Sequence, residues 1–147
     1  MVIQFNSAVK PVLIFSTVLF SLIGIFFGFT VSGMNMSIVM TGVGVFALAG
    51  IVIRNGILLI EFTDELRARG LGVYEAVIEA GATRMTPVIL TAMAAILGLV
   101  PLAIGLNIDF TGLLTHFNPH IHLGGDNVAF WGPLAWTIIF GLTVATF

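Results

Sequence analysis

The chain has 147 residues, a formal net charge of −2, 59% hydrophobic residues and only 8% charged residues. Soluble domains carry about 25% charged residues, so this composition excludes a soluble globular domain, a disordered chain and a nucleic-acid-binding protein with a basic surface. The absence of cysteine excludes disulfide frameworks, CxxC redox pairs and thiolate metal sites, and the composition as a whole indicates a polytopic helical membrane protein.

Four segments are long and apolar enough to form transmembrane helices, each of which needs roughly 20 residues. They are residues 12–30, 36–62, 87–108 and 128–147. Only the second segment contains charged residues, Arg54 and Glu61. The predicted fold class is therefore an all-α membrane protein with four transmembrane helices. Because the fourth segment reaches Phe147 without a polar flank, we expect this span to be cut short.

The basic residues outside the spans predict the orientation, because loops rich in lysine and arginine stay in the cytoplasm. Four of them lie before the first span or between the second and third: Lys10, Arg67, Arg69 and Arg84. The other two loops, residues 31–35 and 107–127, contain neither lysine nor arginine. We therefore expect both termini to be cytoplasmic and the 107–127 loop to be external.

Residues 63–86 form a charged segment on the predicted cytoplasmic side, in which Gly70 and Gly72 interrupt the helical pattern. The spacing over residues 73–80 predicts a separate short amphipathic helix along the membrane surface, with Gly81 as its C-cap. A solvated connector is the alternative interpretation. Neither interpretation assigns chemistry to the segment.

The external loop, residues 107–127, carries three histidines, His116, His120 and His122. Imidazole is a ligand for zinc or copper, which makes these residues weak candidates for a metal site. Pro119 prevents a continuous helix from placing His116 and His120 on one face. The favoured interpretation is an ordered loop whose histidine and asparagine side chains bond backbone groups, without a metal.

Arg54 is the strongest single functional signal. It lies eight residues before Phe62, or about 12 Å along a helix and near the middle of the bilayer. A buried arginine at that depth costs from about 3 to more than 10 kcal/mol unless it is paired or hydrated. Glu61 is about 10 Å further along the helix axis, too far for a direct pair. The sequence therefore predicts that Arg54 pairs with a carboxylate from outside these spans. The alternative is that the Arg54 side chain snorkels toward the membrane surface or donates hydrogen bonds to backbone carbonyls.

Other polar residues give weaker signals. Thr91, in the third span, lies among small residues and is suited to bonding a buried charge, although tight helix packing explains the small residues equally well. The sequence contains no Ser-His-Asp arrangement with supporting context, no Walker sequence and no glycine-rich phosphate turn. It predicts neither an enzyme nor a cofactor.

From Gly50 onward, the order of residues resembles the C-terminal membrane region of resistance-nodulation-division (RND) efflux permeases. Three stretches carry the resemblance: GIVIRNGILLIEFTDELRARG (50–70), YEAVIEAGATRMTPVILTA (74–92) and ILGLVPLAIG (96–105). The resemblance implies that the four spans are the ninth to twelfth helices of a twelve-helix transporter. The alternating order expected for these helices agrees with the orientation drawn from the loop charges.

The resemblance also implies a role for specific residues, because the family couples proton entry to the export of drugs or metals. Its coupling site joins two acids on the fourth helix to a lysine, a threonine and a nearby cytoplasmic arginine. These last three positions fall on Arg54, Thr91 and Arg84, with Asn55 following the first. Two positions depart from the family pattern: Arg54 replaces the usual lysine, and Thr86 stands where a basic residue is common.

The implied partners are the lipid bilayer and the remainder of an RND permease, which would supply the acidic pair and the periplasmic porter domains. A homotrimer with a periplasmic adaptor and an outer-membrane channel, in the bacterial inner membrane, follows from the same resemblance. The chain would then be a C-terminal fragment of a proton-driven exporter. The stretch FNPHIHLGGDNVAFWGPLAW (117–136) is not part of the general family pattern.

Two alternatives stay open at this point. One is another member of the wider superfamily, such as a lipid exporter or an accessory subunit of protein translocation. The other is a self-contained four-helix membrane module with an assembly or binding function. Such a module would take the carboxylate for Arg54 from a second copy, or would have none.

Overall fold

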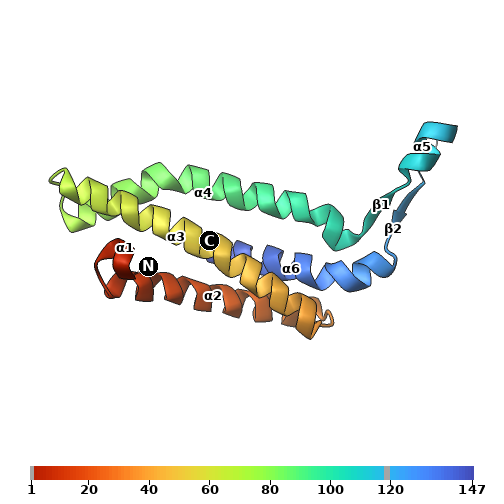
Figure 1. The fold of residues 1–147 in the computed structure, drawn as a ribbon, viewed down its shortest axis with the longest axis horizontal. Coiled ribbons are helices and arrows are strands. Elements are labelled where there is room, and N and C mark those ends of the chain that lie inside the picture. Colours follow the sequence, from red (N-terminus) through yellow and green to blue (C-terminus); the bar gives the residue numbers. More distant parts are fainter. Residues whose placement is uncertain (1, 118–119) are drawn as a thin grey trace.

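The computed structural model describes residues 2–117 and 120–147, which form a bundle of four long helices with a small appendage at one end (Figure 1). After the short helix α1 (Val2–Phe5), the long helices are α2 (Val9–Ser32), α3 (Ile38–Ala68), α4 (Val73–Ile104) and α6 (Asp126–Thr146). Within the described residues, these four helices are long and apolar enough to cross a membrane. They confirm the predicted fold class of an all-α membrane protein with four transmembrane helices.

Glycines end two of the long helices. Gly33 after α2 and Gly105 after α4 have φ angles of 61° and 68°, in the left-handed region. A side chain beyond hydrogen makes that conformation unfavourable, whereas glycine adopts it at little cost and lets the chain leave the helix. Between α3 and α4, the predicted interruption at Gly70 and Gly72 is also present, and Gly70 has a φ of 98°.

The prediction of a separate short helix over residues 73–80 is wrong. These residues are the first turns of α4, which continues through Gly81 without a break to Ile104. The cause is packing: Ala76 and Ala80 are fully buried against Leu66 near the end of α3. A glycine in a helix interior costs about 1 kcal/mol relative to alanine, which does not end a helix held by such contacts.

Helix α6 packs against α2, α3 and α4 and lies at the centre of the bundle. All four long helices contribute to the main core, which consists of Ile25, Phe29, Leu48, Val52, Ala92 and Leu142. Small residues bring the helices close together. Gly28 of α2 lies directly against Phe140 of α6, and a Cβ placed on Gly44 of α3 would lie only 3.0 Å from the Thr137 side chain.

Ionic and polar contacts join α1 and the start of α2 to the far end of α3. Lys10 forms a salt bridge with Asp64. The amide of Gln4 donates a 2.7 Å hydrogen bond to the Glu61 carboxylate. The acids on this part of α3 therefore serve to hold the N-terminal residues of the chain against the bundle.

The segment between α4 and α6 is more regular than the predicted loop. It consists of strand β1 (Leu106–Ile108), helix α5 (Phe110–His116) and strand β2 (Ile121–Leu123). The strands pair antiparallel, with Leu106 opposite Leu123 and Ile108 opposite Ile121. Figure 1 shows the three elements, hereafter the appendage, projecting from the end of the bundle at which α4 ends and α6 begins.

We predict opposite effects for two glycine-to-alanine substitutions. In Gly28→Ala, the new Cβ would overlap the root of the Phe140 side chain and cost about 1–3 kcal/mol of stability. In the control Gly42→Ala, no described atom outside the local backbone of its own helix lies within 4 Å of the new Cβ, and the lower chain entropy should stabilise the helix by about 0.5–1 kcal/mol. Thermal unfolding in detergent, followed by tryptophan fluorescence, should show a lower midpoint for the first variant. Equal midpoints would contradict the close α2–α6 contact.

Candidate functional site in the helix bundle

A cavity of about 170 Å³ lies between α3 and α4. Its lining is Arg54, Asn55, Leu58 and Leu59 from α3, and Arg84, Pro87, Val88 and Thr91 from α4. The structure thus brings together the four residues that the sequence analysis singled out: Arg54, Asn55, Arg84 and Thr91. Two cationic side chains, an amide and a hydroxyl share one space whose other walls are apolar.

Arg54 lies near the middle of α3, and its side chain is exposed. Within the described residues, it forms no hydrogen bond and no ion pair. Glu61, the next acid along α3, is bonded to Gln4 instead. An exposed guanidinium at the middle of a membrane-spanning helix is costly in lipid, so this position needs a polar partner.

The surface around Arg54 is uncovered by the described helices. On α3, Ala47 and Gly50 share the exposed face of Arg54. On α4, Ala94 and Gly98 are exposed, and no atom of another described helix lies within 4 Å of a Cβ built on either Gly50 or Gly98. Small residues in such positions let another helix approach closely, so this surface has the shape of a helix-packing site.

Arg84 is half-buried and reaches back toward α3. Its guanidinium carbon lies 4.5 Å from the centre of the Phe62 ring, which is a cation–π arrangement. Its Nε is buried and has no hydrogen-bond partner among the described residues. Arg84 is therefore held in place by an aromatic face while part of its donor capacity is unused.

The Thr91 hydroxyl donates a 2.8 Å hydrogen bond to the carbonyl of Pro87 on its own helix. It does not bond Arg54 in this structure. A hydroxyl that donates once still has two lone pairs, so Thr91 can accept from a cation without breaking its existing bond. The hydroxyl is thus available to Arg54 as an acceptor only.

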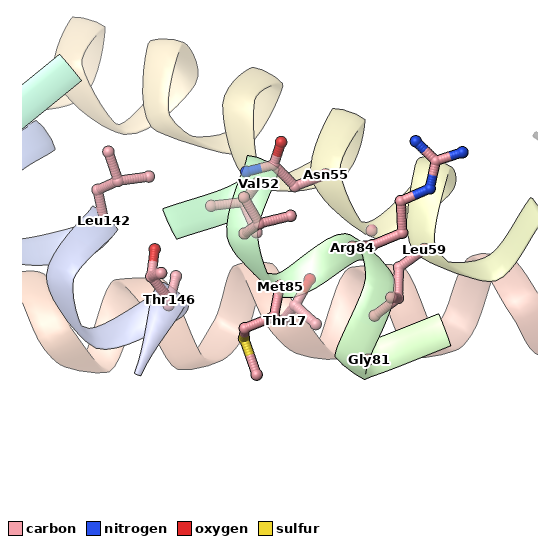
Figure 2. A pocket seen from close by; sticks show the side chains of 12 residues that line it. Thr17, Val52, Asn55, Leu59, Gly81, Arg84, Met85, Leu142 and Thr146 are labelled. Atoms are coloured by element: carbon pink, nitrogen blue, oxygen red, sulfur yellow. The ribbon is translucent and has the colours of Figure 1, made fainter. Parts of the chain in front are cut away.

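A second cavity, of about 260 Å³, adjoins the first and was not indicated by the sequence. Asn55 and Arg84 line both cavities, and the second extends to Thr17, Met85 and Leu142 (Figure 2). In Figure 2, the Arg84 guanidinium points away from Leu142. Gly56 of α3 and Gly81 of α4 also line this cavity.

The three histidines do not form a metal site in the described part of the chain, where no group of three metal-binding side chains is found. His116 ends α5, whereas the rings of His120 and His122 are stacked with centroids 6.1 Å apart. Pro119, which the sequence analysis placed between them, lies outside the described residues. The predicted backbone bonding holds for Asn107, whose amide donates a 2.8 Å hydrogen bond to the Gly124 carbonyl.

Asp109 has a structural role in the same region, as the N-cap of α5. Its carboxylate accepts hydrogen bonds from the backbone N–H groups of Gly112 and Thr111, at 3.1 and 3.0 Å. These bonds, that of Gly112 foremost, lower the pKa of Asp109 below its ordinary value. Because the pKa of Asp109 is lower in the folded protein than in the unfolded chain, the cap contributes its full stability at pH values above the ordinary aspartate pKa. This contribution is lost as the pH falls through the pKa of the folded state.

We predict that the amide chemical shifts of Thr111 and Gly112 titrate with a midpoint below about 3.9, the usual aspartate value. In the control Asp109→Asn, the amide oxygen still caps the helix, and this titration should disappear. Nuclear magnetic resonance of the protein in detergent between pH 7 and pH 2 is a suitable measurement. A midpoint at or above the usual value would show that the cap does not form.

Comparisons with known proteins place the chain among transporters. A family model described as the AcrB/AcrD/AcrF family matches residues 1–107. The swarming motility protein SwrC of Bacillus subtilis is 41% identical over 105 residues, which are 71% of this chain and 10% of SwrC. The cobalt-zinc-cadmium resistance protein CzcA of Cupriavidus metallidurans is 37% identical over 101 residues, 69% of this chain and 9% of CzcA.

The multidrug resistance protein MdtC of Erwinia tasmaniensis matches almost the whole chain. It is 29% identical over 144 residues, which are 97% of this chain and 12% of MdtC. The chain thus spans about a tenth of the length of the curated relatives it matches. The similarity therefore concerns one membrane region of much larger transporters.

Proposed function

This chain belongs to the AcrB/AcrD/AcrF family of RND efflux transporters, and on that premise we propose that it carries part of the proton-coupling site of a proton-driven exporter. Arg54 supplies a fixed positive charge in this proposal. Asn55 and Thr91 orient the charge and its partner, and Arg84 adds a second positive charge nearby. All four side chains line the cavity between α3 and α4.

The observation that carries the proposal is the state of Arg54, a charged side chain at mid-helix with no partner among the described residues. An unpaired charge there costs at least about 3 kcal/mol, and the neighbouring face of small residues is open to another helix. We infer that a carboxylate from the rest of the permease packs against this face. An ion pair with that carboxylate would remove most of the cost.

The proposed mechanism uses Arg54 as the charge that does not change. Arginine stays protonated in proteins, so it cannot carry the transported proton itself. The acid on the partner helix binds the proton, becomes neutral and no longer attracts Arg54. Loss of the pair shifts the equilibrium between two arrangements of the helices, which is how a local charge change becomes a conformational step.

The proposal extends to the whole transporter. We propose that the membrane region described here works with the acidic pair and the porter domains of one permease. We also propose that the permease is a homotrimer in the bacterial inner membrane, joined to a periplasmic adaptor and an outer-membrane channel. The relatives are named for swarming motility, metal resistance and multidrug resistance. Substrate choice then belongs to the porter domains and not to the α3–α4 cavity.

We predict that Arg54→Ala in the full-length transporter abolishes export while the protein still inserts and folds. The substitution leaves the partner acid without its counter-charge, so the acid stays protonated and neutral in the low-dielectric bundle. Arg54→Lys should keep substantial export, because the charge is retained although the fork geometry is lost. Substrate efflux from cells with matched expression levels measures both effects.

Arg67→Ala is a matched control, because it removes an exposed arginine from the last turn of the same helix without touching the cavity. Export by this variant should equal that of the wild type. Normal export by Arg54→Ala would show that Arg54 is merely structural. Proton-coupled export by the 147-residue chain alone would instead favour a self-contained module.

We also propose the orientation, with residues 69–72 in the cytoplasm and the appendage outside the cell membrane. The chain has no native cysteine, so single cysteines at the exposed positions Gly72 and Asn127 report on the two ends of the bundle. In intact cells, a membrane-impermeant thiol reagent should label the cysteine at Asn127 and leave that at Gly72 unlabelled until the membrane is broken. The reverse labelling pattern would overturn the orientation.

A further inference from the structure

The appendage presents an uncovered apolar surface. In its two-stranded sheet, side chains alternate between the two faces, so the cross-strand pairs Leu106–Leu123 and Ile108–Ile121 lie on one face. The pair Asn107–His122 lies on the other face. The four aliphatic side chains are 37–70% exposed, so the described residues cover this face only in part.

Helix α5 adds further apolar side chains to the appendage. Phe110, Leu113 and Leu114 follow a helical spacing along one side of α5, and all three are exposed, Leu114 to 84%. Thr111 and Thr115 lie on the remaining surface of the helix. The appendage is therefore amphipathic in both its sheet and its helix.

Such an element needs a cover to be stable. An isolated two-stranded hairpin is at best marginally stable in water, and these strands have three residues each. The appendage forms hydrogen bonds to its own base, as from Asn107 to Gly124, but these bonds do not hide its aliphatic face. The cover must come from the surroundings of the protein.

The position of the appendage indicates what this cover is. Gly105 alone separates β1 from α4, and Gly124 and Gly125 alone separate β2 from α6. Since α4 and α6 span the membrane, the strands start at its surface. A three-residue strand rises about 10 Å, and the headgroup layer on one side of a bilayer is about 5–8 Å thick. A strand that is tilted toward the membrane plane therefore keeps its aliphatic face at the depth of the headgroups.

The apolar surface also continues from the exposed side of α4. Leu97, Val100 and Ile104 are exposed on α4, and the exposed side chains of Leu106 and Ile108 follow directly. Near the start of α6, Phe130 and Trp131 are 52% and 42% exposed, as is typical of aromatic residues at a membrane interface. The aliphatic face thus extends an exposed apolar surface of a helix that is long and apolar enough to cross the membrane.

From these observations, we propose that the appendage lies in the headgroup layer of the bilayer, with its aliphatic face and the apolar side of α5 against the acyl chains. The proposal requires only that the bundle spans a membrane and does not rest on the proton-coupling role. Residues 107–127 contain two aspartates and neither lysine nor arginine. Apolar burial, rather than attraction to anionic lipids, therefore drives the contact.

Spin labels on single cysteines test the proposal, in a full-length protein from which any other cysteine has been removed; these 147 residues contain none. Labels at Leu114 and Ile121 report on the apolar sides, and labels at Thr115 and His122 are matched controls on the other sides. The full-length protein is reconstituted in phosphatidylcholine, and each label is exposed to oxygen, which enters lipid, and to a water-soluble nickel chelate. The oxygen-to-nickel accessibility ratio at Leu114 and Ile121 should exceed that of the controls several-fold.

Two other outcomes would overturn the proposal. Equal, high nickel accessibility at all four positions would place the appendage in water. Low accessibility to both reagents at Leu114 and Ile121 would mean that a protein surface, from a second copy or another part of the transporter, covers the apolar side. In membranes with added phosphatidylglycerol, the oxygen-to-nickel accessibility ratios should be the same as in phosphatidylcholine alone. A marked increase of these ratios would show that attraction to anionic lipids drives the contact instead.

Discussion

The packing of α6 against α2, α3 and α4 is the contact on which the rest of the bundle depends. In lipid, the hydrophobic effect gives little preference for helix association, so close contact at small residues has to supply it. Gly28 and Gly44 allow this contact, and they fix which sides of α2 and α3 face inward. Val52 of α3 then belongs to the core. Arg54, two residues and about 200° further around the helix, points away from it.

This arrangement separates two kinds of charge. Near the end of α3, Asp64 and Glu61 are bonded to Lys10 and Gln4, and they fix the N-terminal residues against the bundle. At mid-helix, Arg54 has no such contact among the described residues. A permanently paired charge stabilises one arrangement only. A charge whose partner lies on another helix can hold two arrangements, which is what a coupling site requires.

The sequence predicted the spans and the importance of Arg54, because long apolar runs and a charge within one of them are local signals. The residue pattern alone did not predict that Arg54 lies near Arg84 and Thr91, because helical periodicity does not determine which faces of two helices meet. That grouping came from the family resemblance. The continuous α4 was missed because the packing of Ala76 and Ala80 on Leu66 outweighs Gly81. The three-residue strands were missed because they are too short for a visible alternation.

The two adjoining cavities give α3 and α4 room to move when the partner acid of Arg54 gains or loses its charge. Asn55 and Arg84 stand between them, and the larger cavity has mainly apolar walls, including Val52 and Leu142. Apolar walls lower the local dielectric constant around Arg84, which lines both cavities, and so strengthen the effect of its charge. Empty space beside α3 and α4 lets these helices shift without disturbing the close contacts of α6. We therefore expect movement to begin in the cavity-lined part of α3 and α4 rather than at the glycine contacts.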